Sequence, residues 1–252
     1  MKALVTRPRE DAASLTAALL ARGIAPLLEP LLSIELAPDA QAVLAAALPA
    51  AQAALFTSAN GARAFARITP RRNLPVFAVG DATARAAQAA GFTRVESAGG
   101  DVHALAALAA RRLDPAAGAL IHAAASAAAG DLAGDLTRAG FTVRRLRLYE
   151  AVAATCLTAE SRDAMTAGTV AAAIFFSPRT AETFVTLARA AGIEGRAASI
   201  AAVVLSQAVA AALQPLTWRR IEIAAAPNET ALLAALDRAL HAAHTGDKER
   251  RT

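Results

Sequence analysis

The sequence is short of cysteine and of aromatic residues. Its 252 residues include one cysteine, one tryptophan and one tyrosine, and aromatic residues make up 4% of the chain. The lone Cys156 excludes a disulfide framework and a cysteine-based zinc site within the chain, so a reducing cytoplasm is the expected location. Alanine fills much of the 56% hydrophobic fraction. The few Phe, Leu and Ile side chains must therefore supply most of the core packing.

Long hydrophobic runs are also missing. No run reaches the length of a membrane-spanning helix without a charge, a proline or a glycine. At the start of the chain, only Ala3-Leu4-Val5-Thr6 separates Lys2 from Arg7, which is too short for the apolar core of a signal peptide. We therefore expect a soluble, cytoplasmic protein.

The charge balance is positive, with a formal net charge of +5 and a pI of about 10.5. Such a balance suits nucleic acid, an anionic membrane or a polyanionic small molecule as partner. The basic residues are scattered and are not interleaved with aromatic residues, so a nucleic-acid surface is disfavoured.

The chain contains an internal repeat. The segment Phe56-Thr57-Ser58-Ala59-Asn60-Gly61-Ala62-Arg63-Ala64-Phe65 recurs as Phe175-Phe176-Ser177-Pro178-Arg179-Thr180-Ala181-Glu182-Thr183-Phe184, with Phe, Ser, Ala and Phe at the same places. Further segments repeat at similar offsets: 19–24 with 136–141, 79–84 with 205–210, and 104–108 with 232–236. This period is far longer than the roughly 20–50 residues of solenoid repeats, so it indicates a duplicated domain. Two similar domains form a cleft, and clefts between domains are preferred ligand sites.

Short hydrophobic runs alternate with alanine-rich amphipathic segments along the whole chain. This alternation predicts an α/β fold of two similar domains, each a parallel sheet flanked by helices. The predicted extended segments and strands are 3–6, 25–36, 53–57, 76–79, 94–97, 119–123, 143–149, 171–176, 199–204 and 220–223. The predicted helices are 10–22, 59–68, 81–90, 102–112, 131–138, 159–167, 178–190, 207–213 and 229–241. The charged segment 245–252 is predicted to be a disordered tail.

In such folds, ligands bind at the carboxyl ends of the strands. The turns there offer hydroxyls, amides and the backbone N–H groups of helix N-termini, which bind anions without a cofactor. Ser177 before Pro178 is the clearest example, as a helix cap alone or as a cap that also binds a ligand, and Ser58 has the same two interpretations. Arg7 and Arg179 lie beside turns, where they would bind carboxylates or form surface ion pairs. No dinucleotide, phosphate-loop or nucleophile-elbow motif is present.

Three further positions carry titratable side chains of interest. Tyr149, the only tyrosine, is predicted at a strand end, as a proton donor in a dry cleft or as a packed residue with its hydroxyl in water. His122 ends a predicted strand and either faces the cleft or is a satisfied structural histidine. The pair His241 and His244 is interpreted as a solvated helix end rather than a metal site.

Taken together, these residues give the whole chain a resemblance to the uroporphyrinogen-III synthase family. The motifs that carry it are Leu4-Val5-Thr6-Arg7-Pro8, Pro30-Leu31-Leu32-Ser33-Ile34, Phe56-Thr57-Ser58-Ala59-Asn60-Gly61, Val79-Gly80-Asp81-Ala82-Thr83-Ala84, Leu148-Tyr149, Phe175-Phe176-Ser177-Pro178-Arg179-Thr180 and Thr230-Ala231-Leu232-Leu233-Ala234-Ala235-Leu236. Each motif is weak alone, but their order and spacing argue against a chance match.

The resemblance implies domain limits that differ from those of the repeat, which alone would divide the chain near Leu113. Residues 1–32 and 154–244 would form domain 1, and residues 39–147 domain 2. Residues 33–38 and 148–153 would be extended linkers between the domains. Tyr149 would then lie at the hinge beside the cleft.

The resemblance also implies the chemistry. The protein would be a cofactor-independent lyase that cyclises hydroxymethylbilane, with inversion of ring D, to uroporphyrinogen III in haem biosynthesis. Its partner would be this small-molecule linear tetrapyrrole, with hydroxymethylbilane synthase as the candidate protein partner, no nucleic acid, no membrane, no cofactor and no metal. We expect a monomer. Tyr149 would protonate the departing hydroxyl, and the substrate-binding residues would be Arg7, Ser58, Ala59, Asn60, Thr83, Ser177, Arg179 and Ser206.

Two segments depart from the family pattern. The alanine-rich loop at 123–130 stands where relatives often carry Gly and Arg, and Ser206-Gln207-Ala208-Val209 replaces a commoner Gly and Thr pattern. The loop keeps a second hypothesis open: a non-catalytic two-domain binder of a polycarboxylate or tetrapyrrole. Such a binder would retain its ligand without changing the isomer that forms.

Overall fold

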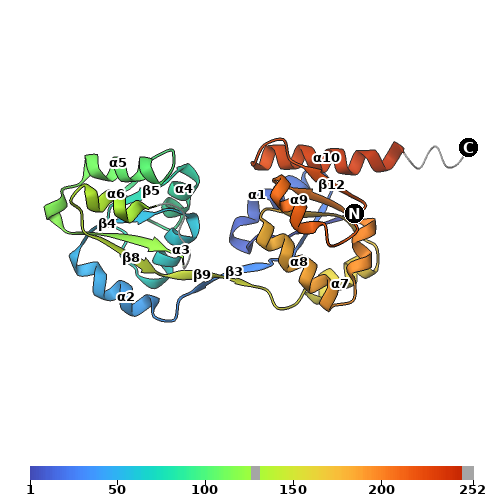
Figure 1. Cartoon of the computed structure of the whole chain (residues 1–252), viewed down its shortest axis with the longest axis horizontal. Coiled ribbons are helices and arrows are strands. Elements are labelled where there is room, and N and C mark those ends of the chain that lie inside the picture. Colours follow the sequence, from blue (N-terminus) through green and yellow to red (C-terminus); the bar gives the residue numbers. More distant parts are fainter. Residues whose placement is uncertain (126–130, 246–252) are drawn as a thin grey trace, which may run out of the picture. The chain divides into compact units, whose positions relative to one another are not determined.

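The computed structural model of the chain describes residues 1–125 and 131–245 (Figure 1). Its chain divides into two compact units: unit 1 is Met1–Ser33 with the chain from Val152 onward, and unit 2 is Ile34–Ala151. The end of the predicted tail and most of the alanine-rich loop lie outside the described residues. Among the helices that the structure describes, none is both long and apolar enough to cross a membrane.

Unit 2 is built on a parallel sheet in the order β6-β5-β4-β7-β8. Helices cover both faces, because side chains alternate along the central strands β4, β5 and β7 and are mostly hydrophobic on both sides. Three helices pack on one face around Phe56, Phe65 and Phe92, whose rings meet edge to face at 5.6–5.8 Å. Two helices pack on the other face. The strands are β4 (Ala51–Phe56), β5 (Val76–Ala78), β6 (Val95–Ser97), β7 (Ala119–Ala124) and β8 (Val143–Arg147); the first face carries α2 (Ala40–Ala47), α3 (Ala59–Ile68) and α4 (Asp81–Ala89), and the second α5 (Val102–Arg112) and α6 (Leu132–Arg138).

Unit 1 has a parallel sheet in the order β12-β11-β10-β1-β2, again covered on both faces. One face buries Phe175 and Phe184 together with Trp218. The other buries leucines of the first and last helices. The strands are β1 (Lys2–Val5), β2 (Ala25–Leu28), β10 (Val170–Phe175), β11 (Ala201–Val204) and β12 (Arg220–Ile223); the first face carries α7 (Ala159–Thr166), α8 (Pro178–Ala190) and α9 (Gln207–Leu213), and the second α1 (Ala13–Leu20) and α10 (Glu229–Thr245).

The two units confirm the predicted duplication. Strands β10, β11, β12, β1 and β2 occupy the places of β4, β5, β6, β7 and β8, so unit 1 is the same fold with the chain begun at another point. The core repeats as well: the rings of Phe175 and Phe184 lie 5.3 Å apart at 71°, and those of Phe56 and Phe65 lie 5.6 Å apart at 67°. The predicted α/β class with two parallel sheets flanked by helices is therefore confirmed.

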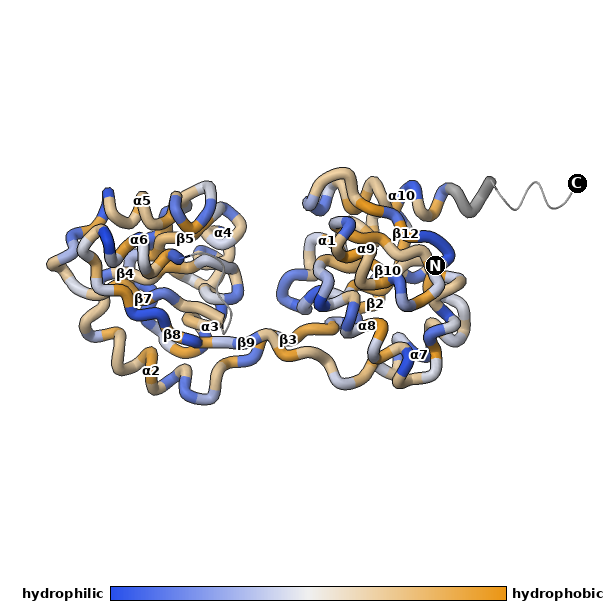
Figure 2. The backbone as a smooth tube through the Cα atoms, viewed as in Figure 1, coloured by the Kyte–Doolittle hydropathy of each residue, from blue (hydrophilic) through white to orange (hydrophobic). Residues whose placement is uncertain are grey.

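The remaining elements are short. Strands β3 (Leu32–Leu36) and β9 (Tyr149–Ala153) pair as a two-stranded sheet where the chain passes from one unit to the other. In Figure 2, β8 stands out as a hydrophilic segment, and it is the edge strand of its sheet. Charged edge strands resist pairing with a second chain. The 3₁₀ helices are η1 (Arg9–Asp11), η2 (Leu48–Ala50), η3 (Pro115–Ala117) and η4 (Glu194–Ser199).

Several predicted boundaries were wrong for local reasons. The predicted helix 10–22 is interrupted, because the Ala12 N–H bonds to Arg9 O in a 3₁₀ turn and α1 starts only at Ala13. Helix α2 was not predicted, although Asp39, a residue type that favours helix starts, stands at its N-cap position. Ser199 belongs to η4 rather than to a strand.

The predicted strand 143–149 was also wrong at its end. Strand β8 stops at Arg147, the Leu148 N–H bonds to Ala124 O at 3.1 Å, and Tyr149 opens β9. The strand is not hydrophobic, because Arg144, Arg145 and Arg147 are exposed. Tyr149 therefore follows the end of a basic edge strand rather than ending an apolar one.

Candidate functional site

The topology locates one candidate site in each unit. In unit 2 the strand order reverses between β4 and β7, and in unit 1 the matching reversal falls between β10 and β1. Parallel strands all end at the same edge of a sheet, and ligands of open α/β sheets bind at that edge beside such a reversal. The turns after β4 and β10 are those that hold the repeated Ser58 and Ser177.

The only tyrosine lies at the unit 2 site. Tyr149 is 6% exposed, and its hydroxyl oxygen lies 2.7 Å from Ser58 Oγ. Ser58 is the N-cap of α3, where its Oγ accepts a hydrogen bond from the Gly61 N–H at 3.1 Å. The structure therefore joins a phenol, a serine hydroxyl and a helix N-terminus.

The start of α3 is held closely against β7. A Cβ atom on Gly61 would lie 2.8 Å from the carbonyl oxygen of Ala123, closer than side chains can approach. Asn60, in the same turn, accepts a hydrogen bond from Arg63 Nη1 at 3.0 Å. Ala59 opens the helix beside them. The turn after β4 is thus rigidly placed, and Ser58, Ala59 and Asn60 lie together there.

The same turn is bonded to a buried histidine. Thr57 Oγ1 lies 3.2 Å from Nε2 of His122, a residue of β7 that is 4% exposed. Its other ring nitrogen, Nδ1, is buried and has no hydrogen-bond partner among the described residues. Burial, and secondarily the charge of Arg145, lower the pKa of His122 to about 4. His122 is therefore neutral at physiological pH, and it is not a fully satisfied structural histidine.

The unit 1 site presents two serine caps. Ser177 caps α8 in a capping box, with its Oγ accepting from the Thr180 N–H and its own N–H donating to Thr180 Oγ1, both at 3.2 Å. Ser206 caps α9 and accepts from the Val209 N–H at 3.4 Å. Helix N-termini of this kind bind anions, because their N–H groups and dipole favour negative charge.

In unit 1, the side chain of Arg7, which follows β1, is held in place by two neighbours. Its guanidinium carbon lies 4.6 Å from the centre of the Phe176 ring, and its Nη1 lies 3.4 Å from Glu229 Oε2. Ser14 donates a hydrogen bond to the other carboxylate oxygen of Glu229 at 2.5 Å. The arginine is thus held against an aromatic ring, with its charge matched by one carboxylate. Arg179, in the first turn of α8, is exposed.

Two predicted positions do not join these groups directly. Thr83 is 6% exposed in α4. His241 Nδ1 lies 2.7 Å from the Asp237 carbonyl oxygen, and within residues 1–125 and 131–245 no group of three metal-ligating side chains gathers.

At the carboxyl end of β6, the Ala104 N–H holds the pKa of the exposed Asp101 below its usual range.

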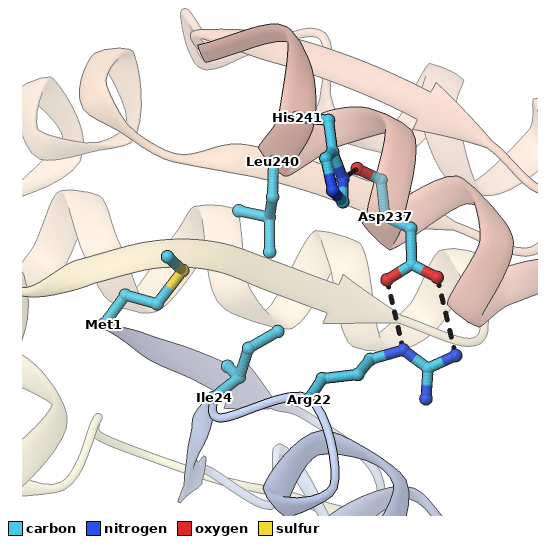
Figure 3. A pocket seen from close by; sticks show the side chains of 6 residues that line it. All are labelled: Met1, Arg22, Ile24, Asp237, Leu240 and His241. Atoms are coloured by element: carbon cyan, nitrogen blue, oxygen red, sulfur yellow. Dashed lines mark hydrogen bonds and ion pairs between the residues drawn. The ribbon is translucent and has the colours of Figure 1, made fainter. Parts of the chain in front are cut away.

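A pocket of about 370 Å³ opens at the opposite edge of the unit 1 sheet (Figure 3). Met1 and Ile24, which line it, precede β1 and β2, so it lies at the amino ends of these strands. Its charged groups are Arg22 and Asp237, which pair with each other at 3.1 Å. The pocket is therefore remote from the carboxyl edge.

Sequence reasoning missed the partners that fix the site. The contact of Thr57 with His122, and those of Arg7 with Phe176 and Glu229, were not recognised, since each joins elements distant in the sequence. A signal was available for His122: it lies at the same alternation as the buried Leu120 in a fully buried strand. A polar residue at such a position is rare unless it has a partner.

The fold and these sites define a class of protein: a duplicated α/β protein whose sheets carry hydroxyls, helix N-termini and arginine at their carboxyl edges, suited to an anionic small molecule. A family model described as uroporphyrinogen-III synthase HemD matches residues 13–234. The chain belongs to the uroporphyrinogen-III synthase family. Its function is the cyclisation of a linear tetrapyrrole to uroporphyrinogen III in haem biosynthesis, and it is a cyclising lyase.

Solved structures resemble this chain over nearly its whole length. The uroporphyrinogen-III synthetase of Helicobacter pylori is 16% identical, with a TM-score of 0.56, over 92% of this chain and 96% of that chain, and it agrees on the fold. The wild-type uroporphyrinogen III synthase of the extremely thermophilic bacterium Thermus thermophilus is 20% identical, with a TM-score of 0.44, over 96% of this chain and 98% of that chain. Among curated proteins, no sequence matches the chain significantly.

Proposed function

We propose that Tyr149 is the general acid of this cyclisation and that Ser58 is its partner. The observation that carries the proposal is the 2.7 Å hydrogen bond between the only phenol of the chain and the serine at the strand-order reversal of unit 2. A phenol donates its proton efficiently only to a group that gains basicity in the transition state. The hydroxyl that leaves hydroxymethylbilane is such a group.

The proton balance closes within the reaction. Tyr149 gives its proton to the departing hydroxyl, which leaves as water. The end ring of the substrate becomes an azafulvene, whose methylene carbon is the electrophile. The phenolate accepts a hydrogen bond from Ser58, and the Gly61 N–H that Ser58 caps makes the serine a better donor. After ring D has attacked and inverted, the proton that restores the aromatic pyrrole returns to the phenolate.

The other contacts fix the geometry of ring closure rather than its chemistry. We assign Ala59, Asn60 and Thr83 in unit 2, and Arg7, Ser177, Arg179 and Ser206 in unit 1, to substrate binding. The capped N-terminus of α8 supplies positive potential for the acetate and propionate groups. Holding the two chain ends in a reactive orientation lowers the barrier by an entropic effect.

The assembly and setting of the enzyme follow as further proposals. Residues 1–32 with 154–244 and residues 39–147 would act as its two domains, with 33–38 and 148–153 as linkers. The enzyme would work as a cytoplasmic monomer that receives its unstable substrate from hydroxymethylbilane synthase. No membrane or nucleic acid takes part.

Replacing Tyr149 by Phe tests the assignment of the acid. The variant keeps the ring and loses only the hydroxyl, so kcat should fall about 100-fold, within the range for loss of a general acid, while KM changes little. Ser58→Ala should lower kcat less, because the phenol remains. Ser199→Ala is the matched control, since its exposed hydroxyl bonds only to Arg196 O in a 3₁₀ helix. A Tyr149→Phe enzyme with unchanged kcat would remove Tyr149 from the chemistry.

A further inference from the structure

The mechanism above gives no role to the buried imidazole of His122. His122 is 4% exposed, its Nε2 bonds to Thr57 Oγ1, and its Nδ1 has no partner among the described residues. A buried polar atom without a hydrogen bond is uncommon and costs stability of the folded state. An apolar residue would fill this place in β7 without that cost. The histidine therefore has a use that offsets it.

Its position suggests the use. Along β4, Leu55 packs with the α5 and α6 side of the sheet and Phe56 with the α3 side. Alternation then directs Thr57 to the α5 and α6 side, where His122 holds it. Ser58, the next residue, is held on the α3 side by Tyr149. The side chains of Thr57 and Ser58 are thus each held by one hydrogen bond, on opposite faces of the sheet.

Successive residues of strand β7 contact the turn that holds Thr57 and Ser58 and the segment that leads to Tyr149. His122 bonds to Thr57, the Ala123 carbonyl oxygen lies 2.8 Å from the position that a Cβ on Gly61 would take, and Ala124 O accepts from the Leu148 N–H, next to Tyr149. One strand end therefore positions both the residue before Ser58 and the residue before Tyr149.

Unit 1 repeats the arrangement with other chemistry. Phe176 stands at the place of Thr57 in the duplicated segment, and it too is contacted from the neighbouring central strand, by the guanidinium of Arg7 after β1. In both units, then, the residue before the capping serine is contacted by a polar side chain, from within the adjacent strand in unit 2 and from the turn that follows it in unit 1. The recurrence supports a role at the turn rather than an accident of core packing.

We infer that His122 is a positioning residue: through Thr57 it sets the orientation of Ser58 and so the hydrogen bond that Ser58 makes with the catalytic phenol. The inference rests on the proposed roles of Tyr149 and Ser58. His122 touches no substrate in this account. It acts only through the Thr57 hydroxyl.

The single tyrosine permits a direct test in the protein without substrate. Tyrosine labelled with ¹³C at Cζ gives one NMR signal, from Tyr149, which responds to the hydrogen bond of the phenol. Thr57→Val and His122→Leu should each shift this signal, and His122→Gln, which keeps a donor near Nε2, should return it toward the native position. Thr137→Val is the control, since its exposed hydroxyl bonds to Ala133 O within α6.

Kinetics give the second readout. Thr57→Val and His122→Leu should each lower kcat roughly fivefold to tenfold, as expected for loss of about one hydrogen bond, with KM nearly unchanged. The double variant should be no slower than either single variant, because both remove the same bond. A core defect would instead lower the melting temperature and leave kcat unaltered.

The NMR and kinetic results distinguish support for the positioning role of His122 from its refutation. A shifted Cζ signal and non-additive kcat losses support the inference, and if His122→Leu does not fold, Thr57→Val and His122→Gln carry the test. A Cζ signal that neither variant moves overturns it. The NMR result needs no turnover, so a failure here is distinct from failure of the proposed acid, which Tyr149→Phe kinetics decide.

Discussion

The buried, neutral state of His122 makes the stability of unit 2 depend on pH in a defined direction. The unfolded chain binds a proton on this imidazole below about pH 6.5, whereas the folded protein, with a pKa of about 4, does not. The unfolded state therefore gains protons first as the pH falls, and the free energy of unfolding drops. Stability from this group is complete above the unfolded value and is lost as the pH falls toward 4.

The size of the effect follows from the two pKa values. One pKa unit corresponds to about 1.4 kcal/mol, so the free energy of unfolding should fall by about 2 kcal/mol between pH 7.5 and pH 5, and by about 3 kcal/mol once the pH is below 4. This is a large part of the stability of a typical domain. His122→Leu carries no titrating group at this position, so its free energy of unfolding should lack this component.

Urea unfolding at pH 7.5 and at pH 5 measures the effect. Circular dichroism follows both units, while fluorescence of Trp218, buried in the core of unit 1, follows that unit alone. The loss at pH 5 should appear in the circular dichroism transition of unit 2 in the native protein and be reduced in His122→Leu. If His122→Leu keeps the full pH dependence, the neutral buried imidazole is refuted.

Two further substitutions test the packing of the turns. Gly61→Ala should destabilise unit 2 by about 1–3 kcal/mol, because its Cβ would meet the Ala123 carbonyl at 2.8 Å, whereas Gly195→Ala, with no atom within 4 Å, should be neutral in urea unfolding. Ser177→Ala should cost about 1 kcal/mol by removing the cap of α8, measured by the shift of the Trp218 fluorescence transition, and no shift would mean that the capping box with Thr180 contributes nothing.

Much of the fold could be predicted from the sequence, because its signals are local. Helices α3, α5, α8 and α9 have the predicted limits, since each starts after a capping residue or strand end and keeps its hydrophobic spacing. The duplication was visible in Phe56, Ser58, Phe65 and their counterparts, and the same phenylalanines form matching ring pairs in the two cores.

The parts that could not be predicted depend on tertiary contacts. The end of β8 is set by a hydrogen bond from Leu148 to Ala124, which no local pattern of the sequence encodes. The Ser58–Tyr149 and Thr57–His122 pairs join residues 91 and 65 positions apart. Sequence reasoning singled out Tyr149, Ser58 and His122 separately, but only the fold joins Tyr149 to Ser58 and His122 to Thr57.

The central claim is that this chain directs ring closure to the type III isomer. The most direct test supplies freshly made hydroxymethylbilane, oxidises the product and separates type I from type III uroporphyrin by chromatography. The account predicts predominantly type III with the native protein, and a shift toward type I with Tyr149→Phe as the uncatalysed closure competes. Type I alone with the native protein, equal to the reaction without enzyme, would contradict it and leave a tetrapyrrole-binding protein.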